Sequence, residues 1–470
     1  MRNIVVYIFS LMGFFAISQN KQILYGFDEI PQSLLLNPGG RILQKKHYGI
    51  PFLSHIHVNG GSSGVSVYDI FKDGNNDIND RITRKIFEMK NTDFFTATQQ
   101  IELINFGWVS KNKIYFSGGI YQEFDFITYF PRDLAILAWE GNRDYLNYEF
   151  DLGEVSTTGD FMTVYHFGLN KKINDKLTVG ARLKLYSSMF SFRSVNNSGT
   201  FVTRLGDENS ENIYEHTVEN ADVTVETAGY ASLRDMDGAG EVAKNILGKA
   251  LFGGNIGVGV DLGFTYQIND NWSVSASALD IGAIFHSKDV ESYHAHGSYT
   301  LDGINLIFPS LADGESTFPY YTDLEDEIER EIPIDTIHKG YTQFRPVKIN
   351  AGLVYGFGRS NFSEACDCLN MGSGGSHIQA VGFQFYGIFR PKGPQVAGTL
   401  YYYRRLTDFI SAKATYTVDP FSFYNVGLGV SANIGKINFY LGADNLLKYG
   451  NLANAKSVSL QLGFNIIIDD

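Results

Sequence analysis

Apolar and polar residues alternate strictly along many stretches of this chain. Every second residue of NIGVGVDLGFTYQ (255–267) is apolar: Ile256, Val258, Val260, Leu262, Phe264 and Tyr266. The residues between them are polar or glycine. Successive side chains of a β-strand point to opposite faces, so this period of two predicts a strand with one apolar and one polar face. The segment SVSLQLGFNII, from Ser457, repeats the pattern.

Short polar turns join such strands into hairpins. INDKLTVGARLKLY from Ile173 and INDNWSVSASALD from Ile268 each begin with an Asn-Asp turn and continue with alternation. Comparable turns lie at 111–113, 406–408 and 435–436. The pattern predicts about 14 strands, each near the roughly 9 to 11 residues that cross a bilayer when tilted.

Two all-β architectures alternate in this way. A soluble sandwich buries its apolar face, and its strands average only about 5 to 6 residues. An outer-membrane barrel turns the apolar face toward lipid and closes every sheet edge. The long consecutive hairpins favour the second, so we expect a closed antiparallel transmembrane β-barrel.

Long insertions separate the hairpins, at 68–96, 131–158, 195–253, 286–346 and 359–376. Bacterial barrels place short turns in the periplasm and long loops outside the cell. This rule predicts periplasmic termini and mostly extracellular insertions, some of which could fold inward as plugs. The insertion at 286–346 carries a strongly acidic run, TDLEDEIEREIPID from Thr322, expected as a solvated loop or a docking surface.

Composition agrees with a barrel. The 49 Gly, 28 Tyr and 36 Phe, with only 19% charged residues, suit extended strands joined by tight turns. A net charge of -13 excludes nucleic acid as a partner, because phosphate contacts need a basic surface.

The N-terminus has the pattern of a secretory signal peptide, expected to span residues 1–18. Arg2 precedes an apolar stretch from Ile4 to Phe15, and the small residues Ala16 and Ser18 suit cleavage. No later stretch approaches the roughly 20 consecutive apolar residues of a transmembrane helix.

Several blocks of the mature chain resemble a family of uncharacterised outer-membrane barrels of Bacteroidota. The resemblance runs from Pro31 to Ile468 and is carried by DEIPQSLLLNPGG, HYGIPFLSHIHVNGGSSG, NIGVGVDLGFTYQINDNWSVSASALDIGAI and YLGADNLLKYGNLANAKSVSLQLGFNIII. Those barrels are similar in fold to the long-chain fatty acid transporter family and to the PorV and PorP barrels of type IX secretion. Gly39 departs from the Asn-Pro-Ala of related barrels, and the chain ends on Asp470 rather than on an aromatic residue.

The resemblance implies a cell outer membrane location and three parts: the signal peptide, a plug-like segment at 19–46 tucked into or beneath the lumen, and a barrel at 47–470. Alternation places seven polar side chains on the inner face of the barrel as candidate lumen-lining residues: Arg182, Lys184, Asp261, Lys413, Asn438, Asp444 and Gln461.

Other motifs predict no cofactor. Asp73 to Asp80 resembles the start of a calcium loop but lacks the glycine and glutamate that an EF-hand needs at its sixth and twelfth positions. The pairs His294/His296 and His55/His57 each share a strand face, yet the sequence specifies no third ligand for a metal. Cys366 and Cys368 fit a strained disulfide, half of a metal site or two free thiols.

No catalytic motif stands out, so we expect a protein that is not an enzyme. Two functions remain open. One is an accessory barrel that binds other outer-membrane or secreted proteins in surface assembly or secretion machinery, in contact with outer-membrane lipid and lipopolysaccharide. The alternative is a transporter of a small hydrophobic or amphipathic substrate. The polar lumen-facing residues slightly favour the accessory role.

Overall fold

A computed structural model describes residues 21–74, 77–206, 213–234, 236, 238–301, 319–359 and 377–468, so the expected signal peptide lies outside the described residues. The strands are β1 (Lys46–Gly49), β2 (Ile56–Ser62), β3 (Phe94–Val109), β4 (Ile114–Tyr129), β5 (Glu149–Asp151), β6 (Thr157–Lys172), β7 (Leu177–Leu205), β8 (Tyr214–Ala228), β9 (Asn255–Gln267), β10 (Trp272–His286), β11 (Ser292–Leu301), β12 (Ile334–Ile337), β13 (Tyr341–Phe344), β14 (Lys348–Arg359), β15 (His377–Arg390), β16 (Gly393–Arg405), β17 (Ile410–Val418), β18 (Asn425–Ile434), β19 (Ile437–Ala443) and β20 (Ser457–Ile468).

Short helices fill the plug segment and the connections: η1 (Gln22–Leu24), η2 (Pro31–Leu35), α2 (Val67–Phe71), α3 (Ile78–Glu88), α4 (Arg132–Glu140), η3 (Leu152–Glu154), α5 (Ala231–Arg234), α6 (Ala239–Lys249), α7 (Pro319–Glu331) and η4 (Leu446–Asn454). Within the described ranges, none of these helices is long and apolar enough to cross a membrane.

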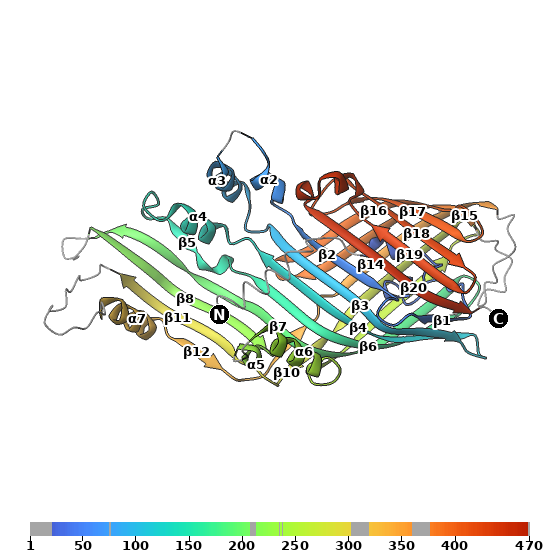
Figure 1. The fold of residues 1–470 in the computed structure, drawn as a ribbon, viewed down its shortest axis with the longest axis horizontal. Helices are drawn as coiled ribbons and strands as arrows, with labels where there is room; N and C mark the ends of the chain where they lie inside the picture. The colour runs from blue at the N-terminus through green and yellow to red at the C-terminus, as the bar shows by residue number, and fades with distance from the viewer. Residues whose placement is uncertain are drawn as a thin grey trace.

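The strands form a closed antiparallel barrel, as the alternation predicts (Figure 1). The barrel has 14 strands when β1 and β2 count as one interrupted strand and β13 and β14 as another. Closure comes from β20, which pairs with β19 on one side and with β1 and β2 on the other. Every strand of the barrel therefore has a hydrogen-bonded neighbour on both sides, which leaves no open edge toward lipid.

The outer face of the barrel is apolar. The outward residues of β9 are exposed, among them Ile256, Val258, Leu262, Phe264 and Tyr266, whereas Asp261 on the inner face is buried. Strand β20 repeats this, with Ser459, Gln461 and Asn465 buried inside. Such extensive apolar exposure is unusual for a protein in water and is expected where the surface meets lipid.

The first barrel strand is interrupted between β1 and β2 by residues 50–55. Pro51 has no backbone N–H and so cannot continue the ladder. The detour keeps the barrel closed, because Ile50 N donates to Phe464 O at 3.1 Å and Phe464 N donates to Leu53 O at 2.9 Å.

The two ends of the barrel differ. The short turns at 110–113, 173–176, 268–271, 406–409 and 435–436 all lie at one end, here called the short-turn end. The opposite end, the long-loop end, carries most of the insertions. The connection after Arg359 is an exception: Arg359 pairs with His377 at the short-turn end, so this insertion emerges opposite to the other long ones.

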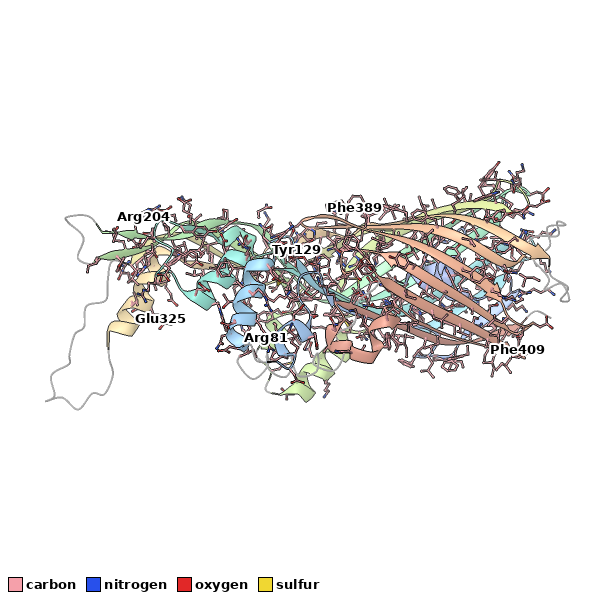
Figure 2. All side chains as sticks on the ribbon, turned by 90° about the horizontal axis from the view of Figure 1, so that it is seen from above. Arg81, Tyr129, Arg204, Glu325, Phe389 and Phe409 are labelled. Carbon is pink, nitrogen blue, oxygen red and sulfur yellow. The ribbon has the colours of Figure 1, made fainter. Side chains whose placement is uncertain are left out.

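The insertion expected as a loop at 195–253 is in part a sheet. Strand β7 continues past the barrel, pairing with β9 up to Ser188 and then with β8 from Ser191. Strands β8, β11 and β12 pair in turn and form an extension beyond the long-loop end. Figure 1 shows this extension at the left, and Figure 2 places Arg204 and Glu325 on it, with Phe409 at the opposite end of the molecule.

The acidic run from Thr322 is not the expected loop, since most of it forms helix α7 in this extension. Its described acidic side chains, Glu325, Asp326, Glu327, Glu329 and Glu331, are exposed. Because these carboxylates are exposed to solvent, water screens their mutual repulsion, and their charge does not prevent the helix from forming.

Candidate functional site

The segment 21–45 lies inside the barrel and fills its lumen. Its apolar side chains form a core of their own with two wall residues, Tyr440 and the partly buried Tyr403: Ile23, Leu24, Tyr25, Phe27, Ile30 and Leu36. A second cluster joins Leu35 to inward-facing wall residues, including Tyr121 and Tyr186. The aromatic side chains of the wall thus provide the apolar surface against which this plug packs.

Polar side chains of the wall bind the backbone of the plug. Arg182 donates to Leu34 O at 2.5 Å, and Lys413 donates to Tyr25 O at 2.5 Å. Further donors to plug carbonyls are Asn170, Ser277 and Asn350. These bonds satisfy backbone groups of a segment that has little regular secondary structure, which burial would otherwise make costly.

Side chains of the plug also bond the wall. Gln32 donates to Glu102 at 3.0 Å and exchanges two hydrogen bonds with Asn465, at 2.8 and 2.9 Å. Glu29 accepts from Tyr403 and Ser411 on the far side of the lumen. Since β3, β17 and β20 all contribute, the plug is held from several directions rather than from one side.

Glycines allow the plug to lie directly on the wall. A Cβ at Gly180 would lie 2.0 Å from Pro38 O, and one at Gly263 would lie 2.1 Å from Asn37 Oδ1. A Cβ at Gly39 would lie 2.4 Å from Gly263 O. The glycine that departs from the Asn-Pro-Ala of related barrels is therefore the one that touches the backbone of β9.

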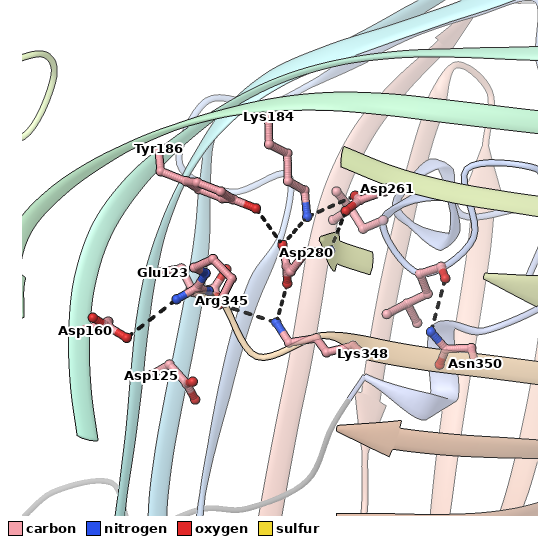
Figure 3. A network of polar contacts seen from close by, with 12 residues as sticks. Glu123, Asp125, Asp160, Lys184, Tyr186, Asp261, Asp280, Arg345, Lys348 and Asn350 are labelled. Carbon is pink, nitrogen blue, oxygen red and sulfur yellow. Dashed lines mark hydrogen bonds and ion pairs between the residues drawn. The ribbon is translucent and has the colours of Figure 1, made fainter. Parts of the chain in front are cut away.

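Beside the plug, eight charged side chains form a network across the lumen, most of which Figure 3 shows. The carboxylates are Glu123, Asp160, Asp261 and Asp280, and the cations are Arg182, Lys184, Arg345 and Lys348. Asp125 and Arg390 form a separate ion pair. All ten side chains are at least largely buried. Five charges of each sign balance, as burial of ionised groups requires.

Asp280 links two cations of this network. Lys184 Nζ lies 2.5 Å from Asp280 Oδ1, and Lys348 Nζ lies 2.8 Å from Asp280 Oδ2. Lys184 also contacts Asp261 at 2.9 Å, and Lys348 contacts Glu123 at 3.4 Å. The network thus runs without a break from β9 through β10 and β14 to β4 (Figure 3).

A β-bulge directs Asp280 into the lumen. The register of β10 against β9 shifts between Ala278 and Ile281, and Asp280 has a φ of 60°. Unbroken alternation would turn Asp280 outward with Ala276 and Ala278. The left-handed conformation, which aspartate tolerates better than most residues, moves the carboxylate to the inner face.

A cavity at the long-loop side of the plug is lined by both apolar and charged side chains. The apolar ones are Tyr386, Ile388, Ala397 and Phe421. The polar ones are Gln100, Glu123, Asp125, Lys348 and Arg390, and strand β15 contributes Arg390 as well as Tyr386 and Ile388. Arg390 binds Asp125 through two parallel contacts, at 2.6 and 2.8 Å. An apolar group and a charged group can therefore be accommodated side by side.

A second cavity opens at the short-turn side of the plug. It is lined by plug residues including Tyr25, Asp28 and Arg41 and by wall residues including His377 and Tyr403. The first cavity has a volume of about 80 Å³ and the second about 150 Å³. The plug lies between them, with Gln22 on the first and Tyr25 on the second.

The seven residues expected to line the lumen are all buried. Three of them, Arg182, Lys184 and Asp261, belong to the charge network. Lys413 also lies over the ring of Tyr401, at 3.9 Å from its centroid. The others are Asn438, which bonds Ser431 and Asn433, Asp444, and Gln461, whose amide has no hydrogen-bond partner. Because the plug fills the lumen, they contact protein, and a role on a transport path stays a prediction.

Sequence reasoning missed most of the network. Glu123 and Asp125 alternate with Phe124 and Phe126, so period two was sufficient to place both inside. Alternation could not place Arg345 in the lumen, because this residue lies between β13 and β14 rather than in a strand.

Of the remaining motifs, the His55 and His57 pair faces the lumen. Both side chains are buried, their rings are 6.2 Å apart, His55 Nδ1 bonds the Tyr440 hydroxyl at 2.6 Å, and His57 lines the first cavity. In the segment from Asp73 to Asp80, which resembles the start of a calcium loop, the side chain of Asp77 caps helix α3 at its first residue, Ile78. Asn75 and both cysteines lie outside the described residues.

A family of unknown function, DUF5723, matches residues 38–444. No curated protein matches the chain. Solved structures that match include a FadL homologue of Pseudomonas aeruginosa, with 10% identity over 97% of this chain and 99% of that one and a TM-score of 0.44. The toluene transporter TbuX of Ralstonia pickettii has 11% identity over 94% of each chain and a TM-score of 0.41.

The toluene transporter TodX of Pseudomonas putida has 9% identity over 96% of this chain and 98% of that one and a TM-score of 0.38. Similarities of this degree carry no argument about what this chain does. A FadL homologue is among these matches, in line with the expected resemblance in fold to the fatty acid transporter family. The resemblance to PorV and PorP and an origin in Bacteroidota stay predictions.

Proposed function

Since the chain belongs to DUF5723, a family of unknown function, we propose from its own geometry that it is a non-enzymatic transporter in the outer membrane. Its substrate is a small amphipathic molecule, which enters at the long-loop end and leaves at the short-turn end. The long-loop end faces the exterior, following the rule that long loops of bacterial barrels are extracellular.

The mixed lining of the first cavity, apolar and charged, carries this proposal. A structural plug needs no open space beside it, and a route for ions or sugars needs no apolar lining. Here Ile388 and Ala397 line the same small cavity as Asp125 and Arg390. Binding sites that join an apolar surface to a few oriented polar groups are typical of small organic ligands.

Transport requires the plug to move. A cavity of about 80 Å³ holds only a few water molecules, so it admits part of a substrate at a time. The plug is bound to the wall by hydrogen bonds such as those of Gln32 and Lys413, which are individually modest. A substrate headgroup that competes for Arg390 or Asp125 offers a way to couple binding to rearrangement of the lumen.

Filling the apolar part of the first cavity tests the proposal. The variant Ala397→Trp places an indole in the first cavity, whereas Leu400→Trp adds the same group to the exposed outer face of the same strand, away from the residues that line the cavity. In lipid nanodiscs we expect octanesulfonate or octyltrimethylammonium to bind the wild type and Leu400→Trp equally, and Ala397→Trp at least about tenfold more weakly.

Equal binding by Ala397→Trp and the wild type, measured against nanodiscs without protein, would exclude this cavity as the substrate site. The barrel's resistance to unfolding in detergent, compared between the two variants, separates a blocked cavity from a misfolded one.

An accessory role in surface assembly or secretion is the second candidate. The observation that favours it is the extension of β7, β8, β11 and β12, which projects beyond the barrel and exposes the acidic helix α7 (Figure 1). Isolation from the native outer membrane in mild detergent tests it: a stoichiometric protein partner supports this role, and recovery alone with bound lipid or fatty acid contradicts it.

A further inference from the structure

Three strands of the extension place two histidines and two aspartates on one face. In β11, His294 and His296 alternate with Ala295 and so point to the same side. Directly opposite His294 in β12 is Asp335, and directly opposite His296 in β8 is Asp222. Paired residues of an antiparallel ladder share a face, so all four side chains gather on it.

The donor atoms of this cluster are close together. A ring nitrogen of each histidine and a carboxylate oxygen of Asp335 all lie within 4.8 Å of one another. His294 Nε2 is 3.0 Å from Asp222 Oδ1, and His296 Nδ1 is 3.8 Å from Asp335 Oδ2. The two imidazoles are stacked, with centroids 4.7 Å apart.

One of these nitrogens has no hydrogen bond. His296 Nδ1 is inaccessible to solvent and lacks a hydrogen-bond partner. A buried ring nitrogen without a partner is costly in a structure made only of protein. A metal ion accepts the lone pair of a neutral imidazole and would remove this cost.

We propose that His294, His296 and Asp335 bind a divalent transition metal, with Asp222 as a fourth ligand, and that Zn²⁺ fits best. Two imidazoles with one or two carboxylates are borderline ligands, which suit zinc in tetrahedral geometry. Calcium and magnesium prefer six or more oxygens and are disfavoured by the two nitrogens.

Only small movements complete the site. Ligands about 2.1 Å from a tetrahedral ion lie about 3.4 Å from one another, compared with separations of up to 4.8 Å here. The Asp222 and Asp335 side chains are 61% and 59% exposed, and those of His294 and His296 are 29% and 45% exposed, so all four have room to rotate while the ladder holds their backbones in place. The ion then joins β8, β11 and β12, and β12 leads directly into barrel strand β13.

The proposal does not depend on transport, because the cluster is on the extension and the charge network and both cavities are in the lumen. At the long-loop end it is accessible without crossing the membrane. It is thus a separate site that fixes the shape of the extension.

Zinc titration of the full purified chain tests the site. Since Cys366 and Cys368 are also potential zinc ligands, the titration is performed in a Cys366→Ser/Cys368→Ser background after removal of metal with a chelator. We expect one Zn²⁺ per chain, weakened at least about tenfold by His294→Ala, by His296→Ala and by Asp335→Asn, with no change in His338→Ala. His338 is an exposed histidine close to Asp335 that bonds Val290 O instead.

Absence of saturable binding, or binding that survives both His294→Ala and His296→Ala, overturns the proposal. Cobalt provides a second measurement, since Co²⁺ in a tetrahedral nitrogen and oxygen site gives an intense visible absorption. That band must appear in the parent protein and disappear in His296→Ala, while the barrel remains folded in both.

Discussion

At the residue scale, the contact between plug and wall depends on the absence of side chains. Gly180 and Gly263 of the wall face Pro38 and Gly39 of the plug at distances that leave no room for a methyl group. A Cβ at Gly180 or at Gly39 would meet backbone atoms of the facing segment, which cannot rotate away as a long side chain does. The plug therefore seats by direct contact between two backbones.

The variant Gly263→Ala should loosen the plug. Its Cβ would meet Asn37 Oδ1 at 2.1 Å and Pro38 Cδ at 2.9 Å, so the segment after η2 must shift. We expect a higher single-channel conductance in planar bilayers than the wild type gives. Gly398→Ala is the control, since its Cβ meets only Phe383 at an ordinary 3.5 Å. Identical conductance in all three proteins would show that this contact does not seal the lumen.

Individual residues show which inward-facing side chains the sequence predicts and which it does not. Period two identified the inner faces of β7 and β9 and so found Arg182, Lys184 and Asp261. It failed at Asp280, because a β-bulge shifts the alternation there by one residue and no feature of the local sequence predicts the bulge. The pairing of Arg182 with Asp261 across two strands depends on register, which a strand pattern alone does not supply.

At the element scale, the extension is the largest departure from expectation. Strand β7 is continuous from the barrel to Leu205. Because barrel strands were expected to be only long enough to cross a bilayer, residues 195–205 at its outer end were assigned to a long insertion. The alternation of this outer end is weaker, because both faces of an extension outside the bilayer meet solvent or other loops. Strand β11 pairs with β8, but two helices and two barrel strands separate them in the chain, so a local pattern cannot predict this pairing.

Helix α6 is held to the loop after β10 through one carboxylate. Asp289 accepts hydrogen bonds from Ser232 N at 3.1 Å, from the Ser232 hydroxyl and from Lys249 Nζ at 2.9 Å. Burial alone would raise the pKa of Asp289, but the contacts with Ser232 and Lys249 outweigh it and lower the pKa below its usual value.

The lowered pKa of Asp289 predicts that the attachment of helix α6 weakens at acidic pH. A carboxylate whose pKa is lowered in the folded state stabilises it fully above the ordinary pKa, and that contribution is lost as the pH falls through the lowered value. We expect hydrogen-exchange protection of residues 239–249 to fall below about pH 4. In Asp289→Asn protection should be low at every pH; a wild-type acid transition that persists in this variant would assign the effect to another group.

At the scale of the whole molecule, a closed barrel, a bound plug and a cavity with both apolar and charged lining residues are the features from which we propose a gated route. The 14-strand barrel and the apolar outer face followed from the sequence, because lipid imposes the same alternation on every strand. The charge network and the cavity did not, since they arise where strands distant in the chain meet. Function therefore depends on the part of the fold that only three-dimensional placement supplies.

Influx into proteoliposomes tests the central claim of amphiphile transport most directly. Octanesulfonate and octyltrimethylammonium keep their charge at every pH and cross protein-free bilayers slowly, and sucrose serves as a wholly polar control. We expect at least one of the two amphiphiles to enter faster than in protein-free liposomes, while sucrose does not. Equal influx of both amphiphiles with and without protein, or accelerated sucrose influx alone, would contradict it.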